Sequence, residues 1–429
     1  MSKHLFHLVS TVFLVLVAAA AGDSDAATRK KKLDPLRPAA STPRPPLARV
    51  DAAAVATDLV PVTGDFARWV EQLAQGDAVA GLAVAVVKDT DVIYERTLGH
   101  ADWSTRTPVT PTTVFRLASL SKGFAAALTG LVVDDGVMSW DTRVAGVLPT
   151  FALADLEGSS RLTVRDILSH RVGLPNNTYD RLLEQAEPYP LLVDRLREVP
   201  LACAVGECYG YQNIAFSLIG DVTYAVTGDF FYHLVEKRLF HPLGMTTATY
   251  GLDALRSSTS WARPHKRSRK TWVAFEPNQN YYHLPPAAGA NASLRDMEQW
   301  LIAQMGGRTD VLAQELLDEL HAPQVATPKD ASLTPWRRER LLDARYALGW
   351  RVFDYAGEPM VFHAGAVKGY RAVIAFLPKH RFGMVMLWNC EAATPNGLLP
   401  MLFDRYLGLP RVDWAGLDQG DEAGASTGG

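Results

Sequence analysis

The sequence predicts an α+β fold in which both ends of the chain form one antiparallel sheet and a helical lobe is inserted between its halves. Short apolar or alternating runs, typical of strands, lie within 80–100 and again within 346–390. The sequence between them has helical periodicity and contains no internal repeat. Strands at both ends of a helical middle favour a single sheet that the returning chain completes.

The opening elements are a helix and a hairpin. Apolar residues at helical spacing predict a helix over Asp65–Ala74, with ordered structure beginning near Thr63. The run Leu82–Val87 predicts a buried strand, and Val92–Leu98 predicts a second one. Because only Lys88–Asp91 separates the two, we expect an antiparallel hairpin.

The rest of the chain supplies the helical lobe and the returning strands. The longest predicted helix, Ser119–Asp134, carries an apolar face and has Gly136 just beyond its end. Further helices are expected over Thr163–Ser169, Ile214–Val226, Phe230–Leu239 and Leu294–Ala303. The returning strands are expected over Leu348–Asp354, Met360–His363, Tyr370–Leu377 and Gly383–Asn389, and a closing helix over Gly397–Tyr406.

The N-terminal segment is typical of an export signal. Lys3 precedes a mostly apolar run, Leu5–Val17, and the small residues Ala18–Gly22 suit a signal peptidase. We therefore predict a signal peptide over 1–22 and a periplasmic protein. The alternative is an uncleaved N-terminal anchor, although the apolar run is somewhat shorter than the ~20 residues of a spanning helix. Membrane contact is expected only through this segment, if it is uncleaved.

A linker and a tail flank the folded part of the chain. Residues 23–58 are basic and rich in proline, which predicts an extended, solvated linker. Contact of its basic residues with an anionic membrane or a cell-wall polymer is the functional alternative. Residues 59–412 are predicted as the folded domain. Residues 413–429, acidic and rich in Gly and Ser, are predicted as a disordered tail.

Composition limits the partners of this protein. The 429 residues include 21% charged residues and give a formal net charge of -3, so nucleic acid is not an expected partner. Three cysteines without closely spaced histidines predict no metal site. Cys203 and Cys208 could form a disulfide that leaves Cys390 free, or all three could be buried thiols; the export signal favours the disulfide.

Three short motifs carry residues suited to nucleophilic catalysis. In the first, Ser119 and Lys122 are three residues apart and share one face of a predicted helix. A buried lysine near a helix N-terminus can lose its proton and act as the base for a serine hydroxyl. Such a four-residue pattern also arises by chance, so its place between a strand hairpin and an apolar helix gives it weight.

The other two motifs are weak when taken alone. Tyr211–Asn213 (YQN) precedes a predicted helix; a tyrosine can carry a proton, and an asparagine can hold a carbonyl group or fix a lysine. His363–Gly365 (HAG) lies at a strand end, where small residues let a substrate backbone lie along the strand edge. A turn with a core aromatic residue, and an ordinary strand end with a partly buried histidine, are the structural alternatives.

In order and separation, the three motifs resemble those of class C β-lactamases, serine D,D-peptidases of the penicillin-binding proteins, and their esterase relatives. The likeness extends from about Phe66 to Leu407. GLAVAVVKDTDVIYERTLGHAD resembles the family's opening hairpin, TPVTPTTVFRLASLSKGF its nucleophile helix, and HAGAVKGYRAVIAFLPKHRFGMVMLWN its closing strands. The resemblance implies a β-lactamase-like fold and makes 59–412 a catalytic domain that needs no cofactor.

The resemblance also implies roles for the matching residues. Ser119 would be the nucleophile and would form a covalent acyl-enzyme. Lys122 would be its partner base, and Tyr211 would be the second proton carrier. Asn213 would orient Lys122 and an amide of the acyl side chain.

The third motif departs from the family pattern. The backbone N–H groups of Ser119 and Ala366 would form the oxyanion hole, and His363 and Gly365 would line the substrate strand. The class C enzymes usually carry Lys-Thr-Gly here, whereas this chain has His-Ala-Gly. Ala364 lacks the hydroxyl group, and a histidine is only partly charged near neutral pH. Recognition of a substrate carboxylate is therefore expected to be weaker.

This departure decides the expected function. We expect a serine hydrolase that cleaves an amide or ester bond of a peptide or small-molecule substrate and reacts only weakly with β-lactams. Lys368 and Arg371, just beyond the motif, could supply the missing charge or lie in solvent. The alternatives are a true class C-like β-lactamase, or a penicillin-binding sensor or scaffold that is acylated without turnover.

Overall fold

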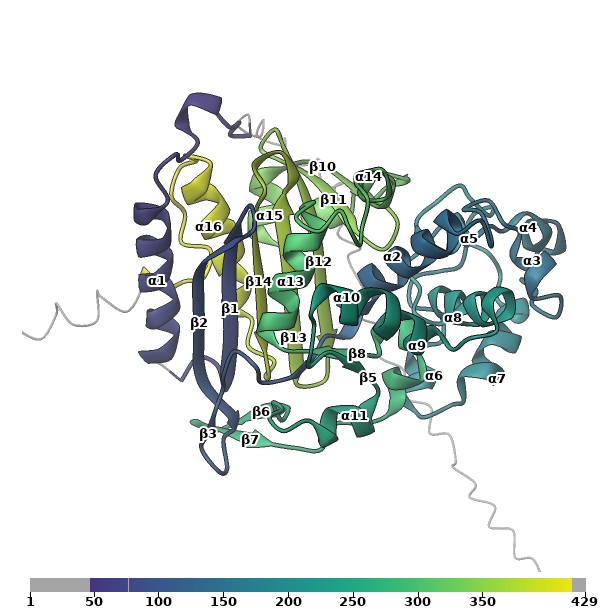
Figure 1. Ribbon diagram of the computed structural model, residues 1–429, viewed down its shortest axis with the longest axis horizontal. Coiled ribbons are helices and arrows are strands. Elements are labelled where there is room, and N and C mark those ends of the chain that lie inside the picture. The colour runs from purple at the N-terminus through teal and green to yellow at the C-terminus, as the bar shows by residue number, and fades with distance from the viewer. Residues whose placement is uncertain (1–46, 76, 419–429) are drawn as a thin grey trace, which may run out of the picture. The chain divides into compact units, whose positions relative to one another are not determined.

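The computed structural model describes residues 47–75 and 77–418; the predicted signal peptide, most of the predicted linker and the end of the predicted tail lie outside this range. The described chain contains a nine-stranded antiparallel sheet (Figure 1). In order across the sheet, its strands are β3 (Thr107–Pro108), β2 (Asp91–Asp102), β1 (Gly81–Lys88), β14 (Phe382–Trp388), β13 (Tyr370–Leu377), β12 (Glu358–Val367), β11 (Arg351–Tyr355), β10 (Leu341–Tyr346) and β9 (Val325–Ala326).

The two ends of the chain meet in the middle of this sheet. β1 pairs with β2 on one side and with β14 on the other, with Leu82 opposite Trp388 and Lys88 opposite Phe382. The predicted hairpin and the predicted sheet formed from both ends are therefore confirmed.

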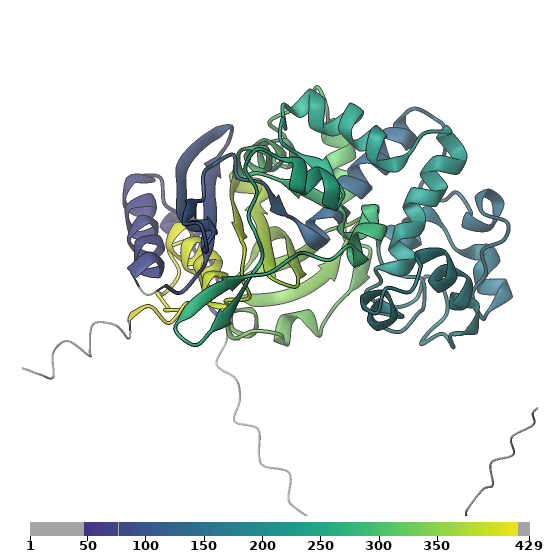
Figure 2. The same cartoon turned by 90° about the horizontal axis from the view of Figure 1, so that it is seen from below.

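Helices cover both faces of the sheet (Figure 2). Two smaller sheets accompany the large one: β4 (Phe115–Arg116), β8 (Ala290–Ala292) and β5 (Thr249–Tyr250) form one, and β6 (His265–Ser268) and β7 (Thr271–Ala274) form the other. The described α-helices are α1 (Val60–Gln75), α2 (Ser121–Asp134), α3 (Val144–Val147), α4 (Leu156–Arg161), α5 (Val164–Leu168), α6 (Asp180–Glu184), α7 (Tyr189–Asp194), α8 (Ile214–Thr227), α9 (Phe231–Val235), α10 (His241–Leu243), α11 (Leu252–Ser257), α12 (Pro285–Ala288), α13 (Leu294–Gln304), α14 (Gln314–His321), α15 (Pro335–Arg340) and α16 (Leu398–Tyr406).

β1 is apolar throughout because both of its faces are covered. Successive side chains of a strand point to opposite faces, so its residues divide between two cores. One core lies under α1 and α16, and the other lies under α13 and the helical lobe. The residues facing the lobe are Ala83, Ala85 and Val87, and those facing α1 and α16 are Leu82, Val84 and Val86.

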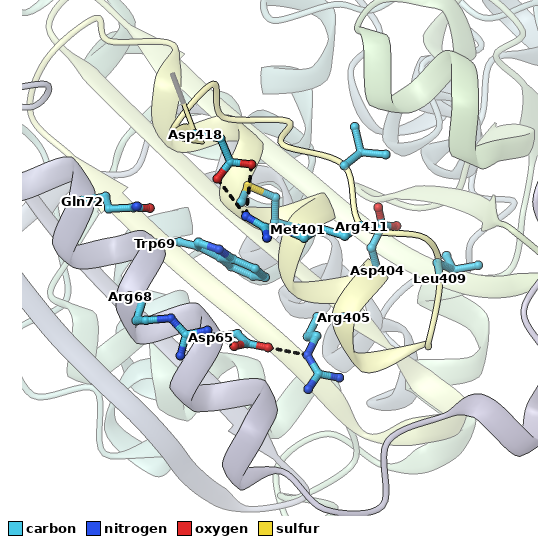
Figure 3. A pocket seen from close by; sticks show the side chains of 11 residues that line it. Asp65, Arg68, Trp69, Gln72, Met401, Asp404, Arg405, Leu409, Arg411 and Asp418 are labelled. Atoms are coloured by element: carbon cyan, nitrogen blue, oxygen red, sulfur yellow. Dashed lines mark hydrogen bonds and ion pairs between the residues drawn. The ribbon is translucent and has the colours of Figure 1, made fainter. Parts of the chain in front are cut away.

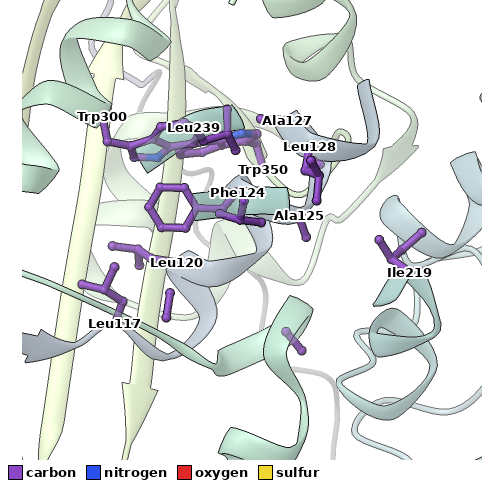
Figure 4. Packing of buried hydrophobic residues seen from close by; sticks show 14 of the residues in the cluster. Leu117, Leu120, Phe124, Ala125, Ala127, Leu128, Ile219, Leu239, Trp300 and Trp350 are labelled. Atoms are coloured by element: carbon purple, nitrogen blue, oxygen red, sulfur yellow. The ribbon is translucent and has the colours of Figure 1, made fainter. Parts of the chain in front are cut away.

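α2 is the central helix of the lobe core, and its burial fixes the first motif in space. The Phe124 ring lies 4.4 Å from the Trp300 ring, measured between centroids (Figure 4). On another side, the Phe124 ring lies 5.1 Å from the Phe240 ring. A Cβ atom on Gly123 would lie 2.8 Å from the Trp350 ring, so only glycine allows this close approach. A helix that is apolar on nearly all sides is buried on nearly all sides.

Several element boundaries differ from those predicted. Ser119 does not begin the long helix; it lies in a 3-10 turn, η2 (Ala118–Leu120), and α2 follows at Ser121. The predicted helix 230–239 divides into α9 and a π-helical turn, Glu236–Phe240. The edge strand β9 and its neighbour β10 were not predicted, because each is short and has no strict alternation.

The part of the linker range that is described contacts the folded domain. The N–H of Val50 donates to the carbonyl of Ala356, and the N–H of Ala56 donates to the carbonyl of Tyr406, both at 2.8 Å. Ordered contacts therefore begin before Thr63. At the other end, within the range predicted as a disordered tail, Asp418 accepts a hydrogen bond from Arg411 at 2.8 Å.

Within residues 47–75 and 77–418, no single helix has the length and hydropathy of a membrane span. Ile214–Thr227 and Phe231–Leu243 meet that test only together, as a pair bent by 83°.

Candidate active site

Ser119 lines a pocket of about 730 Å³ at the turn that leads into α2. Ala118, immediately before it, has a φ of 49°, a left-handed conformation that is uncommon for a residue other than glycine. Ser121 stabilises this turn, because its hydroxyl donates to the Ala118 carbonyl at 2.7 Å and accepts from the Ala290 N–H at 3.0 Å. Backbone strain of this kind is concentrated at functional sites.

Lys122 is completely buried one residue further along α2. Its Nζ atom donates to Asn213 Oδ1 at 2.7 Å and to the Ala287 carbonyl at 3.1 Å. Burial lowers the pKa of Lys122 to about 7; the carboxylate of Asp180 opposes this shift, and the cation of Arg351 adds to it. A substantial share of Lys122 is therefore an uncharged amine at neutral pH, as a base requires.

Tyr211 contacts both Ser119 and Lys122. Its ring centroid is 4.7 Å from Lys122 Nζ. Burial raises the pKa of Tyr211 to about 12, while a hydrogen bond with Ser119 acts in the opposite direction. Tyr211 is consequently an uncharged phenol at neutral pH, which can donate or relay a proton but is not a standing phenolate base.

Asn213 joins Lys122 to a residue that the sequence motifs did not indicate. Its Nδ2 atom donates to Asp180 Oδ2 at 2.7 Å, on the side opposite to its contact with Lys122. Asp180 is the first residue of α6 and also lines the pocket. Burial raises the pKa of Asp180, whereas the hydrogen bond from Asn213 and the charge of Lys122 act in the opposite direction and favour the carboxylate form. A single aspartate outside the three motifs has no recognisable spacing, so only the folded chain could identify it.

His363 and Gly365 do not line the pocket, which corrects that prediction. Strand alternation places Ala364 and Ala366 in the pocket wall and turns His363 away from it, leaving its side chain 2% exposed. Burial lowers the pKa of His363 well below its usual value, and the nearby cations Arg351 and Lys122 act in the same direction. His363 therefore contributes no positive charge to the pocket.

Gly365 instead permits contact between β12 and the turn that carries Ser119. A Cβ atom at Gly365 would lie 2.2 Å from the carbonyl oxygen of Leu117 and 3.3 Å from the Cβ of Ala118. No other residue fits there without moving the strand or the turn. Ser119 and Ala366 face the same pocket, so the oxyanion hole formed by their N–H groups stays a consistent prediction.

Burial lowers the pKa of two histidines, His170 and His363, well below the usual value, and one hydrogen-bonded chain links their rings. His170 Nδ1 accepts from the Gln212 N–H at 3.1 Å, so its proton is on Nε2, which contacts the Tyr346 hydroxyl at 3.2 Å. That hydroxyl lies 3.1 Å from His363 Nε2, and His363 Nδ1 lies 2.9 Å from the Ala364 carbonyl. The His170 ring also packs against the Tyr211 ring, with centroids 4.4 Å apart.

Arg351 brings a positive charge to the pocket from the neighbouring strand β11. Its side chain is mostly buried, pairs with Asp330 and lies 5.6 Å from the Tyr211 ring centroid. β11 pairs with β12 only as far as Phe362, so the edge of β12 beyond that residue is open toward the pocket. The exposed Lys329 lines the same pocket.

Neither of the two cations suggested by the sequence takes this place. Lys368 is exposed, with its Nζ 5.6 Å from the Phe275 ring centroid. Arg371 donates to the carbonyl groups of Val367 and Tyr370, at 2.7 and 2.8 Å. Neither residue is part of the pocket wall. Proximity in the sequence was misleading here, because the turn after β12 carries Lys368 and strand β13 carries Arg371, and neither side chain reaches the pocket.

The predicted disulfide between Cys203 and Cys208 is present, and Cys390 is a free, buried thiol. Cys208 is part of the pocket wall, together with Tyr209. The bonded loop therefore forms one rim of the pocket and leads directly into Tyr211.

A second pocket, of about 410 Å³, lies between α1 and α16 (Figure 3). Its charged groups are largely paired with one another: Arg405 donates to Asp65 at 2.5 Å, and Arg411 donates to Asp418 at 2.8 Å. It contains none of the predicted site residues.

In the described part of the chain, no three His, Cys, Asp or Glu side chains gather closely enough to hold a metal ion.

Comparisons with known proteins match most of the chain. The family model for Beta-lactamase matches residues 66–399. Unguisins hydrolase ungD' of Aspergillus campestris is 27% identical over 376 residues, which cover 82% of this chain and 68% of that protein. Penicillin-binding protein 4 of Amycolatopsis lactamdurans is 28% identical over 345 residues, which cover 77% of this chain and 87% of that protein.

A solved structure shares the same architecture. The octameric penicillin-binding protein homologue from Pyrococcus abyssi superposes with a TM-score of 0.70 at 21% sequence identity, and the match covers 81% of this chain and 78% of that one. At this level of identity the likeness establishes the fold.

Proposed function

Because this chain belongs to the Beta-lactamase family, we propose that it is a serine hydrolase that cleaves an amide or ester bond through a covalent intermediate on Ser119. The observation that carries the proposal is the state of Lys122. This lysine is fully buried, its pKa is about 7, and it follows Ser119, which lines the pocket, by three residues. The names of two relatives, a hydrolase and a penicillin-binding protein, agree with this class of chemistry.

The proposed reaction begins with acylation. The uncharged amine of Lys122 takes the proton of Ser119 Oγ as that oxygen attacks the carbonyl carbon of the substrate. The backbone N–H groups of Ser119 and Ala366 stabilise the negative charge on the carbonyl oxygen. When the intermediate collapses, the C–N or C–O bond breaks, and the phenol of Tyr211 protonates the leaving group. Tyr211 then recovers a proton from the ammonium group of Lys122.

Deacylation repeats these steps with water in place of the serine hydroxyl. A water molecule gives a proton to the pair formed by Lys122 and Tyr211 and attacks the acyl carbon. The C–O bond to Ser119 breaks, and Ser119 recovers its proton. No cofactor takes part in either step.

The proposed substrate is an ester or peptide-like molecule that carries an anionic group. The open edge of β12 suits an extended substrate backbone. Arg351, close to the ring of Tyr211, supplies the cation that a carboxylate group would pair with. We rank esters and peptides above β-lactams because the third motif, His-Ala-Gly, lacks the lysine and the hydroxyl group of the class C enzymes, and because Arg351 is already paired with Asp330.

The proposed location is the periplasm, reached through the signal segment predicted over 1–22, with an N-terminal membrane anchor as the alternative. The disulfide between Cys203 and Cys208 supports an oxidising compartment.

The test is intact-mass spectrometry of the protein after brief exposure to a fluorescent penicillin or a chromogenic ester, with Ser119→Ala in parallel. We expect a mass adduct in the wild-type protein, turnover of the ester, and neither in the variant, whose melting temperature should stay close to wild type. Equal turnover by both proteins would overturn the proposal.

The fate of the penicillin adduct separates the alternatives. Rapid loss of the adduct with consumption of the drug indicates a β-lactamase. A stable adduct without turnover of any ester or peptide indicates a penicillin-binding sensor.

The contribution of Arg351 is tested by Arg351→Gln, with Arg371→Gln as the matched control. We expect KM for an ester that carries a carboxylate group to rise about tenfold in the first variant, which corresponds to about 1.4 kcal/mol of binding free energy. KM for a neutral ester should change little in either variant. An equal effect on charged and neutral esters would contradict recognition of the carboxylate.

A further inference from the structure

The hydrogen bonds of Lys122 leave one position on its nitrogen atom free. An uncharged primary amine has two N–H donors and one lone pair. The two partners of Lys122 Nζ, Asn213 Oδ1 at 2.7 Å and the Ala287 carbonyl at 3.1 Å, are both acceptors. Both donors are therefore used, and the lone pair is the group left to accept a proton from Ser119.

The orientation of the Asn213 amide decides whether this lone pair stays free. The oxygen and the NH₂ group of an asparagine have nearly the same shape, so rotation of the amide by half a turn exchanges an acceptor for a donor. With Nδ2 toward Lys122, the amide would donate a hydrogen bond to the lone pair. The amine could not then take the proton of Ser119.

Asp180 holds the amide in the productive orientation. An ionised carboxylate only accepts hydrogen bonds, so the atom of Asn213 that faces it must be Nδ2. The contact between Asn213 Nδ2 and Asp180 Oδ2 is 2.7 Å long, and the Oδ1 atom of the same amide faces Lys122. The hydroxyl of Tyr281 supports Asp180 Oδ2 from 3.4 Å.

The placement of Asp180 is unfavourable for folding. Tyr179 and Asn177, just before it, have φ angles of 63° and 56°, in the left-handed region. The second carboxylate oxygen, Asp180 Oδ1, is buried without a hydrogen-bond partner. A buried acceptor without a partner reduces stability. Such features persist where the function of a site needs them.

From these contacts we infer that Asp180 is a positioning residue, which fixes the Asn213 amide so that the lone pair of Lys122 is kept for Ser119. This inference rests on the proposed function and extends it to a residue outside the three motifs. Asp180 acts through Asn213 and does not itself exchange a proton with the substrate.

The charges that face Lys122 come from two elements, and they allow the roles of Asp180 to be separated. Asp180 on α6 stabilises the ammonium form of Lys122, and Arg351 on β11 destabilises it. The other titratable groups nearby, His170, His363 and Tyr211, are uncharged at neutral pH. Removal of the carboxylate of Asp180 therefore moves the pKa of Lys122 further below about 7.

The experiment compares wild type, Asp180→Asn and the control Glu184→Gln, using kcat and KM for a chromogenic ester from pH 5 to 9.5. Asparagine at 180 keeps the size of the side chain but no longer dictates the orientation of Asn213. We expect kcat on the high-pH plateau to fall about tenfold or more, KM to change little, and the acid limb to move to lower pH. Glu184→Gln removes a charge on the same helix without touching Asn213 and should stay within about twofold of wild type.

A double variant, Asp180→Asn with Asn213→Asp, sharpens the test. An aspartate at 213 can only accept hydrogen bonds, so it restores an acceptor facing Lys122 whatever residue 180 does. We expect the plateau kcat to recover from its value in Asp180→Asn, with the acid limb now at higher pH than in wild type, because a carboxylate touches the lysine. Melting temperatures establish that each variant is folded. If Asp180→Asn is unfolded, Asp180→Glu takes its place. Asp180→Glu keeps a carboxylate that only accepts hydrogen bonds, so it is expected to retain most of the activity.

The outcomes are distinguishable. An unchanged plateau in Asp180→Asn, a rise in KM with unchanged kcat, or no recovery in the double variant would overturn the positioning role and leave hydrolysis through Ser119 intact. If the wild-type protein shows no turnover, or turnover that Ser119→Ala leaves unchanged, the proposed function is overturned, and this inference with it.

Discussion

Burial changes the chemistry of single residues in this protein more than direct charge pairing does. Lys122 makes hydrogen bonds only to neutral groups, and burial brings its pKa to about 7. The same burial brings the pKa of Tyr211 to about 12. At neutral pH, Lys122 can therefore accept a proton while Tyr211 can donate one.

The difference between the pKa values of Lys122 and Tyr211 predicts the pH dependence of acylation. The active form of Lys122 is the uncharged one, so kcat/KM should rise with pH through about 7 and then reach a plateau. Because Tyr211 keeps its proton up to about pH 12, no fall is expected below pH 9.5. The rate of ester hydrolysis between pH 5 and 9.5 checks this. A bell-shaped profile centred near pH 7 would contradict the assignment of Lys122 as base and Tyr211 as acid.

At the scale of elements, the site depends on how closely β12 approaches the turn that carries Ser119. The approach requires a residue without a side chain, and Gly365 is that residue. The neighbouring Ala364 and Ala366 form the wall of the pocket. The distance between strand and turn therefore sets the width of the proposed oxyanion hole.

Gly365→Ala is expected to separate these two elements. The new Cβ would collide with the Leu117 carbonyl, and such overpacking costs about 1–3 kcal/mol of stability. Displacement of the reacting groups by an ångström can reduce kcat about 100-fold. Thermal melting and ester kinetics measure the two effects. Ala366→Gly is the matched control, since that position faces the open pocket, and its melting temperature should change far less.

The disulfide loop is a second element that supports the site. Cys203 and Cys208 close a short ring that forms a rim of the pocket and leads into Tyr211. Replacement of both residues by serine should lower the free energy of unfolding by about 2 kcal/mol, since the reduced chain gains entropy when unfolded. It should also lower kcat, because Tyr211 is held less firmly.

Mild reductant should reproduce this loss of activity in the wild-type protein without unfolding it, as judged by circular dichroism. Cys390→Ser, which removes the buried free thiol, controls for effects of reductant unrelated to the loop. Indifference of kcat to both the reductant and the double replacement would leave the disulfide a structural feature alone.

At the scale of the whole molecule, the sheet cannot form from either end of the chain alone. β1 lies in the interior of the sheet and is covered on both faces, and its partner β14 comes from the far end of the chain. An N-terminal fragment without the returning strands would expose the apolar edge of β1.

A fragment that ends at residue 340 is therefore expected to be insoluble or unfolded when produced alone. Co-expression with residues 341–418, which supply β10 to β14 and α16, should recover soluble protein. Solubility and circular dichroism of the fragments check this. A soluble, folded N-terminal fragment would show that the helical lobe is stable without the sheet.

The sequence by itself predicted most of the fold, because apolar periodicity is a local property. The strand Tyr370–Leu377 matches β13 at both ends, and the helix predicted over 294–303 differs from α13 by one residue. The predicted element boundaries were wrong where the local pattern and a tertiary contact disagree. At Ser119, for example, contact with β12 holds the chain in a 3-10 turn.

For the site, the family resemblance of the three motifs was enough to choose Ser119, Lys122, Tyr211 and Asn213, which the structure brings together; their catalytic roles stay predictions. Only the tertiary structure decided that His363 faces away from the pocket and that Arg351 and Asp180 line it. The physical reason is that a motif records neighbours along the chain. Burial, hydrogen-bond polarity and charge depend on residues that are distant in sequence and meet only when both ends of the chain complete the sheet.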